Sequence, residues 1–132
     1  MMEAGSYYVG DLCYVLHEEW DEVCGLIIKG NNCLDGEFNL KDGRRFACYS
    51  TMWGDGLYLD QYGREYGVDA GLIGCILMSD IGFDDDRNFV SGGQVQTFDQ
   101  SFTTDGGRGE RGWDGVIRIG HVVIETDPKD EC

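Results

Sequence analysis

Histidine and cysteine side chains can carry nucleophilic or metal chemistry, and the chain has 2 histidines and 6 cysteines. His17 lies where a helix is predicted to begin, and His121 lies in a strand-like run. Neither belongs to a nucleophile motif such as G-x-S-x-G. The cysteines are widely and irregularly spaced without a C-x-x-C pair, so they match no zinc-ligand pattern. A catalytic Cys–His pair would require the fold to join residues that are distant in the chain.

One short acidic run has the spacing of calcium ligands. Asp84, Asp86 and Asn88 place oxygen atoms at alternate positions, as the beginning of a D-x-D-x-N calcium loop does. The match ends there, because Phe89 occupies the position of the turn glycine and Val95 that of the final glutamate. We expect no cofactor and interpret the run as a solvated acidic turn, with a weak calcium site as the alternative.

Carboxylates and tyrosines leave enzymatic chemistry open without favouring it. Spacing alone cannot select an acid–base pair from 25 Asp and Glu residues. A small hydrolase is therefore the third-ranked hypothesis, and it would use Asp11, Asp55 or His17 beside tyrosine-rich strands. The 7 tyrosines could line a small-molecule pocket, but strand alternation turns about half of such rings inward, where core packing explains them.

The main compositional feature is a formal net charge of −15, from 25 acidic and 10 basic residues spread along the chain. Nucleic acids and anionic membranes attract Lys and Arg, so this charge disfavours both as partners. It favours a basic protein as partner, or serves only to keep the protein soluble. The predicted acidic binding surface consists of Glu18, Glu19, Asp21, Glu22, Asp84, Asp85 and Asp86.

The leading functional hypothesis is therefore a non-enzymatic binding protein that acts through protein–protein contacts. Electrostatic complementarity would give fast, salt-dependent association with a basic partner. One such role is a decoy for a basic protein that normally binds nucleic acid.

A glycine-rich segment suggests a second role. Thr103–Gly115 contains 5 glycines, and we predict a connection without secondary structure. Such connections are uncommon inside a compact domain and are usually functional or mobile. Arg108, Arg111 and Trp113 would anchor the segment on a neighbouring subunit, as in a structural or virion-accessory protein. An exposed edge strand would also allow a homo-oligomer.

A single helix is predicted among the elements that position these residues. Apolar residues recur at helical spacing, with the acids on the other face; they are Leu16, Trp20, Val23, Cys24 and Ile27. The pattern predicts about three turns, ended by Lys29 and Gly30.

The remaining elements are predicted to be short strands separated by glycine turns, 5 of them Asp-Gly steps. The predicted strands are Ser6–Val9, Leu12–Leu16, Glu37–Leu40, Arg44–Thr51, Leu57–Asp60, Glu65–Val68, Leu72–Met78, Gln94–Phe98, Val116–Ile119 and His121–Thr126. The predicted fold is mainly β: a partly closed antiparallel barrel or a sandwich, with one amphipathic helix packed on it.

The 132 residues are predicted to form a single domain, with an ordered core over about 5–126 and a polar tail at 127–132. The N-terminus lacks the features of a secretory signal, and no apolar run is long enough to cross a bilayer. The cysteines are therefore predicted to be buried thiols of a cytoplasmic protein, with a disulfide framework as the alternative.

Two stretches, GSYYVGDLCYVL (5–16) and FACYSTMWGDGLYLDQYGREYGVDAGLIGCI (46–76), are similar to small uncharacterised proteins of tailed phages and large DNA viruses. The resemblance implies a viral context, and hence the host cytosol or a virion. It brings no activity and no functional residue with it.

Overall fold

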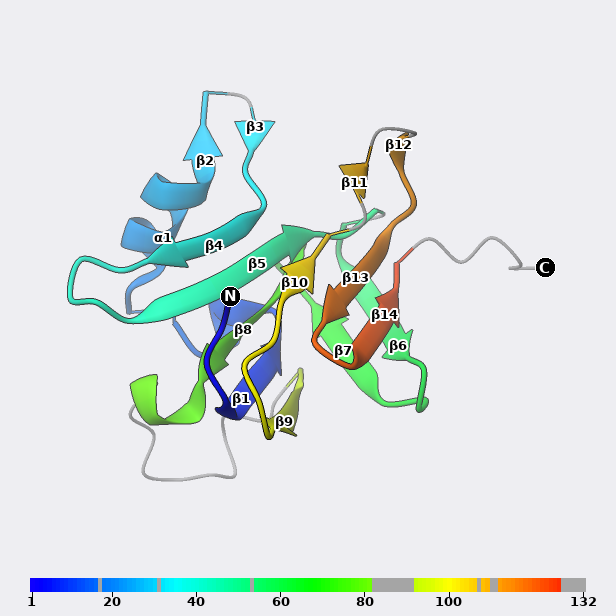
Figure 1. The fold of residues 1–132 in the computed structure, drawn as a ribbon. Coiled ribbons are helices and arrows are strands. Elements are labelled where there is room, and N and C mark those ends of the chain that lie inside the picture. Colours follow the sequence, from blue (N-terminus) through cyan, green and yellow to red (C-terminus); the bar gives the residue numbers. More distant parts are fainter. Residues whose placement is uncertain are drawn as a thin grey trace.

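Two antiparallel five-stranded sheets form most of the protein (Figure 1). The computed structural model describes residues 1–16, 18–30, 32–52, 54–81, 92–106, 108–109 and 112–126, with the backbone alone at 29, 32, 33, 108, 109, 112 and 113. The first sheet has the order β4 (Gly36–Asn39), β5 (Arg45–Ser50), β8 (Leu72–Leu77), β1 (Gly5–Gly10) and β9 (Gln94–Phe98). The second has the order β10 (Thr104–Asp105), β13 (Val116–Ile119), β14 (Val122–Glu125), β6 (Gly56–Asp60) and β7 (Glu65–Val68).

The shorter elements surround the first sheet and extend from the second (Figure 1). They are the 3-10 helices η1 (Leu12–Tyr14) and η2 (Met78–Asp80), the helix α1 (Trp20–Ile27), the strand pair β2 (Ile28–Lys29) and β3 (Asn32–Cys33), and the strand pair β11 (Arg108–Gly109) and β12 (Gly112–Trp113). The prediction of a mainly β fold with one helix is confirmed. The sheets are not closed into a barrel, so the sandwich is the alternative that holds.

One hydrophobic core lies between the two sheets. Strand β1 directs Tyr7 and Val9 into it, because alternate residues of a strand face the same side. The second sheet contributes Ile117, Ile119 and Ile124, all fully buried. Burial of aromatic and aliphatic side chains from both inner faces is the main force that holds the two sheets together.

A second core lies on the opposite face of the first sheet. Tyr8, Phe46 and Ile76 point to this side, where they meet Val23 and Ile27 of helix α1. The first sheet is therefore covered on both faces, and the domain has three layers: helix, sheet and sheet. Double burial explains why β1, β5 and β8 read as nearly continuous apolar runs rather than as alternating ones.

A buried polar network joins the sheets at the corner where β7 meets β9. The hydroxyl of Tyr66 donates to Asp60 Oδ2 (2.7 Å) and accepts from Gln96 Nε2 (3.2 Å). Beside it, the backbone N–H of Gly67 donates to the carbonyl of Gly92 (2.7 Å). Fully bonded buried polar groups favour one arrangement of the sheets over others.

The predicted strand Leu12–Leu16 is wrong. Residues Leu12–Tyr14 form η1 instead, because the side chain of Asp11 accepts a hydrogen bond from the backbone N–H of Cys13 and starts a turn. The apolar residues at this place are still buried, but by folding back over the first sheet rather than by pairing with it.

The predicted helix is shorter than expected, with 8 residues from Trp20 to Ile27. Its chain continues directly into β2, and Gly30, with a φ of 63°, lies at the turn between β2 and β3 instead of capping the helix. The segment Thr103–Gly115 also differs from the prediction, because it contains β10, β11 and β12 rather than an unstructured connection.

Gly74 provides a test of the close packing between β5 and β8. A Cβ atom at this position would lie 2.0 Å from the carbonyl oxygen of Ala47. We expect Gly74→Ala to lower the free energy of unfolding by about 3 kcal/mol, measured by urea denaturation. The control is Gly25→Ala in α1, where a Cβ meets nothing within 4 Å and should stabilise the helix by about 0.5–1 kcal/mol. Similar effects of the two substitutions would contradict this packing.

Candidate functional site

Two acids of the predicted binding surface hold helix α1 against the turn between β4 and β5. The carboxylate of Glu19 lies 2.8 Å from Nη1 of Arg44. The carboxylate of Glu22 accepts a hydrogen bond of 2.6 Å from the backbone N–H of Lys41. These two side chains therefore have structural partners inside the chain.

Arg44 connects three elements around this turn. Its Nε donates to both carboxylate oxygens of Asp42, at 3.1 and 2.9 Å. Its Nη1 donates to the backbone carbonyl of Asp80 in η2 (3.0 Å). Hydrogen bonds from Arg44 lower the pKa of Asp42. Gly43, with a φ of 99°, makes the sharp turn that brings Asp42 and Arg44 together.

The surface around this turn remains negative. Glu18 and Asp21, the other two helix acids, are exposed. Residues 18–22 and 41–44, which we call the α1–turn surface, contain five acids and two bases, for a formal charge of −3. The Arg44 charge is compensated within this surface, so the exposed carboxylates dominate its field.

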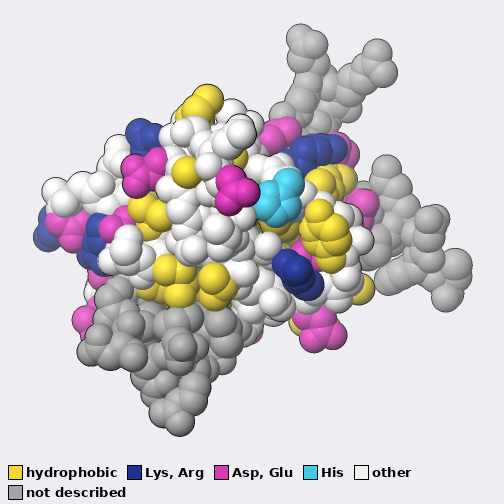
Figure 2. Space-filling model, turned by 60° about the horizontal axis from the view of Figure 1, so that its bottom comes forward, with side chains coloured by type: hydrophobic (Ala, Val, Ile, Leu, Met, Phe, Trp, Pro, Cys, Tyr) yellow, Lys and Arg dark blue, Asp and Glu magenta, His cyan; other side chains and the backbone are white. Residues whose placement is uncertain are grey.

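The other described arginines are also held by partners within the chain. Arg45 lies 3.4 Å from Glu37, and Arg118 lies 3.7 Å from Asp105 and 3.9 Å from Asp114. Arg64 donates to Gln96 and lies over the ring of Tyr62. On the face drawn in Figure 2, basic side chains lie beside acidic ones. Exposed pairs of this kind contribute little stability, but each places the positive charge of a described arginine beside an acid of the same chain.

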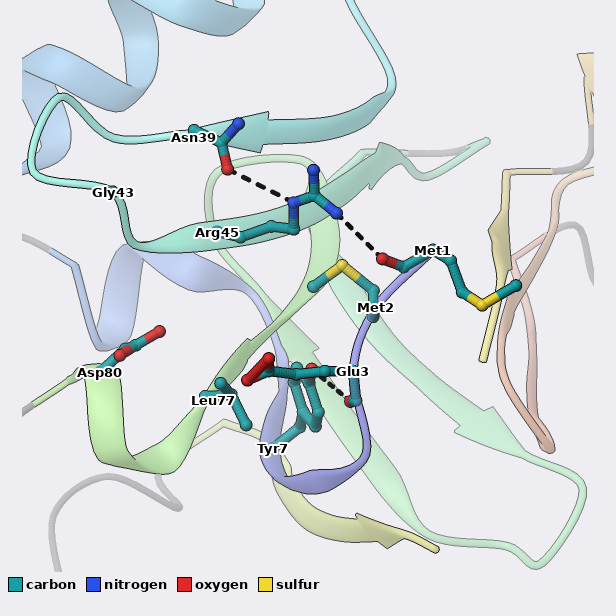
Figure 3. Close-up of a pocket in the computed structure, with 9 residues that line it drawn as sticks. All are labelled: Met1, Met2, Glu3, Tyr7, Asn39, Gly43, Arg45, Leu77 and Asp80. Atoms are coloured by element: carbon teal, nitrogen blue, oxygen red, sulfur yellow. Dashed lines mark hydrogen bonds between the residues drawn. The ribbon is translucent and has the colours of Figure 1, made fainter. Parts of the chain in front are cut away.

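A cavity of about 300 Å³ opens between β5, η2 and the N-terminal segment (Figure 3). Its lining includes Met2, Glu3, Tyr7, Arg45, Leu77 and Asp80. The hydroxyl of Tyr7 donates to the backbone carbonyl of Glu3 (2.7 Å) and so anchors the N-terminal segment. Burial raises the pKa of Asp80; the charges of Glu3 and Asp42 add to this effect, and Arg44 opposes it.

A shallower groove of about 390 Å³ lies beside His121, which is visible as the histidine in Figure 2. The imidazole packs at 4.9 Å, tilted, on the ring of Phe98. Asp99 and Ser101 also line the groove, but within the described part of the chain no hydrogen bond links either of them to His121. The geometry of a nucleophile–base pair is thus not present here.

Of the residues proposed for a hydrolase, Asp11 and Asp55 lie in different surroundings. Asp11 is fully buried, and its carboxylate accepts hydrogen bonds from the backbone N–H groups of Cys13, Asp69 and Ala70 (3.0, 2.8 and 2.6 Å). It thereby ties the end of β1 to the turn before β8. Asp55 is exposed, and His17 lies outside the described residues.

The surroundings of Cys13 and Cys75 disfavour the thiolate form. Burial raises the pKa of Cys75 to about 12. Burial, followed by the hydrogen bond and charge of Asp11, raises the pKa of Cys13 to about 12. Because the thiolate is the reactive form of cysteine, a raised pKa makes both groups weaker nucleophiles at neutral pH. Cys48 and Cys75 are buried, as predicted, whereas Cys13 and Cys24 are only partly buried.

Several predicted residues lie outside the described part of the structure, namely Asp84, Asp85, Asp86, Asn88 and Arg111. Arg108 and Trp113 lie opposite each other in the register of β11 and β12. Within the described residues there is no group of three or more His, Cys, Asp or Glu that could hold a metal ion. In the same part of the chain, no helix is long and apolar enough to span a membrane.

The cavity residues Glu3, Arg45 and Asp80 were not predicted from the sequence. They come from three segments that are far apart in the chain, and none belongs to a recognisable motif. The turn at Asp11 could be recognised in the sequence, because an aspartate side chain commonly accepts a hydrogen bond from the backbone N–H two residues later and so starts a turn.

Asp11→Asn tests the buried carboxylate. We expect the free energy of unfolding to fall by about 1–3 kcal/mol, because the neutral amide replaces charge-assisted hydrogen bonds and brings in a donor without a partner. The substitution should also speed alkylation of Cys13 by iodoacetamide in the folded protein, measured by mass spectrometry, since one cause of its raised pKa is removed. Unchanged stability would show that Asp11 is not a structural anchor.

Asp80→Asn tests the cost of the carboxylate in the cavity. The pKa of Asp80 is raised in the folded state, so its stabilising contribution is present only at low pH and is lost as the pH rises through the raised value. We expect Asp80→Asn to increase stability by less than about 1 kcal/mol at pH 7 and to have no such effect near pH 3, measured by urea denaturation. Glu65→Gln, at an exposed site, corrects for the general loss of negative charge. A gain that does not depend on pH would contradict the assignment.

Comparison with models of protein families, with curated proteins and with solved structures finds no match for this chain. The resemblance to phage and viral proteins therefore stays a prediction. The function has to be inferred from the charges, contacts and cavities of this chain itself.

Proposed function

We propose that this protein is a non-enzymatic binding protein whose acidic surface engages a basic protein. The observation that carries the proposal is a formal net charge of −15 combined with the internal pairing of arginines such as Arg44, Arg45 and Arg118. Cations that are already paired leave the excess carboxylates to determine the external field, which attracts positively charged partners and repels nucleic acid.

The α1–turn surface is the proposed point of contact. It is held rigid by the bonds of Glu19, Glu22 and Arg44, so a partner need not order it on binding. Glu18 and Asp21 are exposed beside these bonded residues, at the start of helix α1. Preorganised charges lose less conformational entropy on association than charges on a mobile loop.

The surroundings of the nucleophilic groups support binding over catalysis. The pKa values of Cys13 and Cys75 are raised to about 12. The carboxylate of Asp11 already accepts three backbone hydrogen bonds. A catalytic group would instead need a pKa near the working pH and an open position beside the substrate.

The resemblance to phage and viral proteins gives this proposal a context. A virus-encoded acidic protein in the host cytosol would compete with nucleic acid for a basic, nucleic-acid-binding protein. The negative field and its unsuitability for direct contact with phosphates are consistent with such a decoy.

The α1–turn surface can be tested with fluorescently labelled poly-L-lysine as the basic partner. We expect Glu18→Gln/Asp21→Asn to weaken binding about three- to tenfold, since each exposed charge pair contributes about 0.2–1 kcal/mol. The affinity should also fall steeply as NaCl is raised from about 50 to 500 mM. Binding is measured by fluorescence anisotropy.

The matched control is Glu65→Gln/Glu125→Gln on the outer face of the second sheet, which removes the same charge from exposed positions. Equal losses for the two double variants would mean that only net charge matters and would reject the α1–turn surface. A discrete, salt-insensitive oligomer in light scattering, without binding to poly-L-lysine, would favour the structural role instead.

A further inference from the structure

The cavity beside η2 has a volume and an apolar wall that suit a short alkyl chain. Its volume of about 300 Å³ is at the lower end of the range of pockets that hold small ligands, about 300–1,000 Å³. The partly buried Leu77 presents apolar surface to the cavity, and the buried side chains of Met2 and Tyr7 lie beneath that surface. Methylene groups pack well on such a surface while a charged end stays at the polar rim.

Two carboxylates face this space. In Figure 3, the side chains of Glu3 and Asp80 point into the cavity from opposite sides. Within the described residues, neither carboxylate accepts a hydrogen bond or forms an ion pair. Burial also raises the pKa of Asp80, which means that the surroundings of this carboxylate disfavour its charge. A bound cation would relieve that cost.

The neighbouring arginines do not neutralise the pair. Arg45 donates to Asn39 Oδ1 (3.3 Å) and to the carbonyl of Met1 (2.9 Å), and its charge lies 3.4 Å from Glu37. Arg44 reaches the backbone carbonyl of Asp80 rather than its carboxylate. Both guanidinium groups are therefore held by other partners.

From this geometry we infer that the cavity binds an alkylammonium group, with the ammonium between Glu3 and Asp80 and the methylenes on Leu77. An anionic ligand would meet these two carboxylates. The cations of the described lining, Arg45 and the N-terminal ammonium of Met1, are held by other partners, Glu37 among them. A divalent ion such as calcium needs six to eight oxygen ligands, and these two side chains do not supply them. An ammonium group needs only a few acceptors and tolerates an apolar neighbour.

The cavity adjoins the α1–turn surface. Gly43 and Arg45 line the cavity, while Asp42 and Arg44 belong to the turn on its border. A basic segment lying on that surface can therefore place one lysine side chain in the cavity. This identification of the ligand as a lysine rests on the proposed function; the affinity for an alkylammonium group does not.

The test is an NMR titration of the 15N-labelled full chain with cadaverine, with lysine blocked at both its backbone ends, and with glutarate. We expect both amines to shift the amide signals of residues around the cavity, with Kd values on the order of 1 mM, and glutarate to have no effect. Glu3→Gln/Asp80→Asn should weaken amine binding at least tenfold. Glu65→Gln/Glu125→Gln, with the same change in charge, should stay within twofold of the native protein.

The outcomes separate this inference from the proposed function. Poly-L-lysine binding without any response to the amines would overturn the cavity site and leave the acidic surface intact. Binding of cadaverine without binding of blocked lysine would overturn the lysine assignment and identify a site for free amines. Equal losses in the two double variants would reduce the effect to net charge and reject the site. Binding of both amines, lost only in the Glu3/Asp80 variant, is the expected result.

Discussion

The architecture depends on one constraint, which is that the first sheet must be covered on both faces. Strands β1, β5 and β8 carry large apolar side chains on each side, such as Tyr7 towards the second sheet and Tyr8 towards the helix. Leaving either face in water would expose several aromatic and aliphatic side chains, at a cost of about 1.5–3 kcal/mol for each. Helix α1 and η1 cover one face, and the second sheet covers the other. The positions of the α1–turn surface and of the cavity follow from these two layers.

Charge determines what the surface of this scaffold can do. With 25 acids and 10 bases, most charged positions must be acidic, and in the described part of the chain Arg44, Arg45 and Arg118 lie beside acids. Arg44 shows why this matters, since a single guanidinium holds Asp42, Glu19 and the carbonyl of Asp80. The same contacts that stabilise the turn remove its positive charge from the surface. A stable fold and a negative field are thus produced by the same interactions.

The inferred amine site differs from the exposed acids in its physical basis. Exposed carboxylates act at a distance, and salt screens them over about 10 Å. In the cavity, the partly buried Asp80 and the exposed Glu3 lie beside apolar surface of Leu77, where shape contributes to binding as well as charge. Together they would allow fast encounter through the surface field and selection of a lysine by the cavity.

The class of fold, most of the strands and the sign of the net charge could be predicted from the sequence, because local alternation, glycine turns and composition do not depend on distant contacts. The prediction of a strand at Leu12–Leu16 was wrong because the Asp11 carboxylate accepts from the Cys13 N–H and starts η1. The further bonds of this carboxylate to Asp69 and Ala70 join segments that no local pattern connects. The sequence could not separate Glu19 and Glu22, which hold the turn, from the exposed Glu18 and Asp21. Only the tertiary structure brought Glu3, Arg45 and Asp80 around one cavity, because strand pairing joins segments that no local pattern connects.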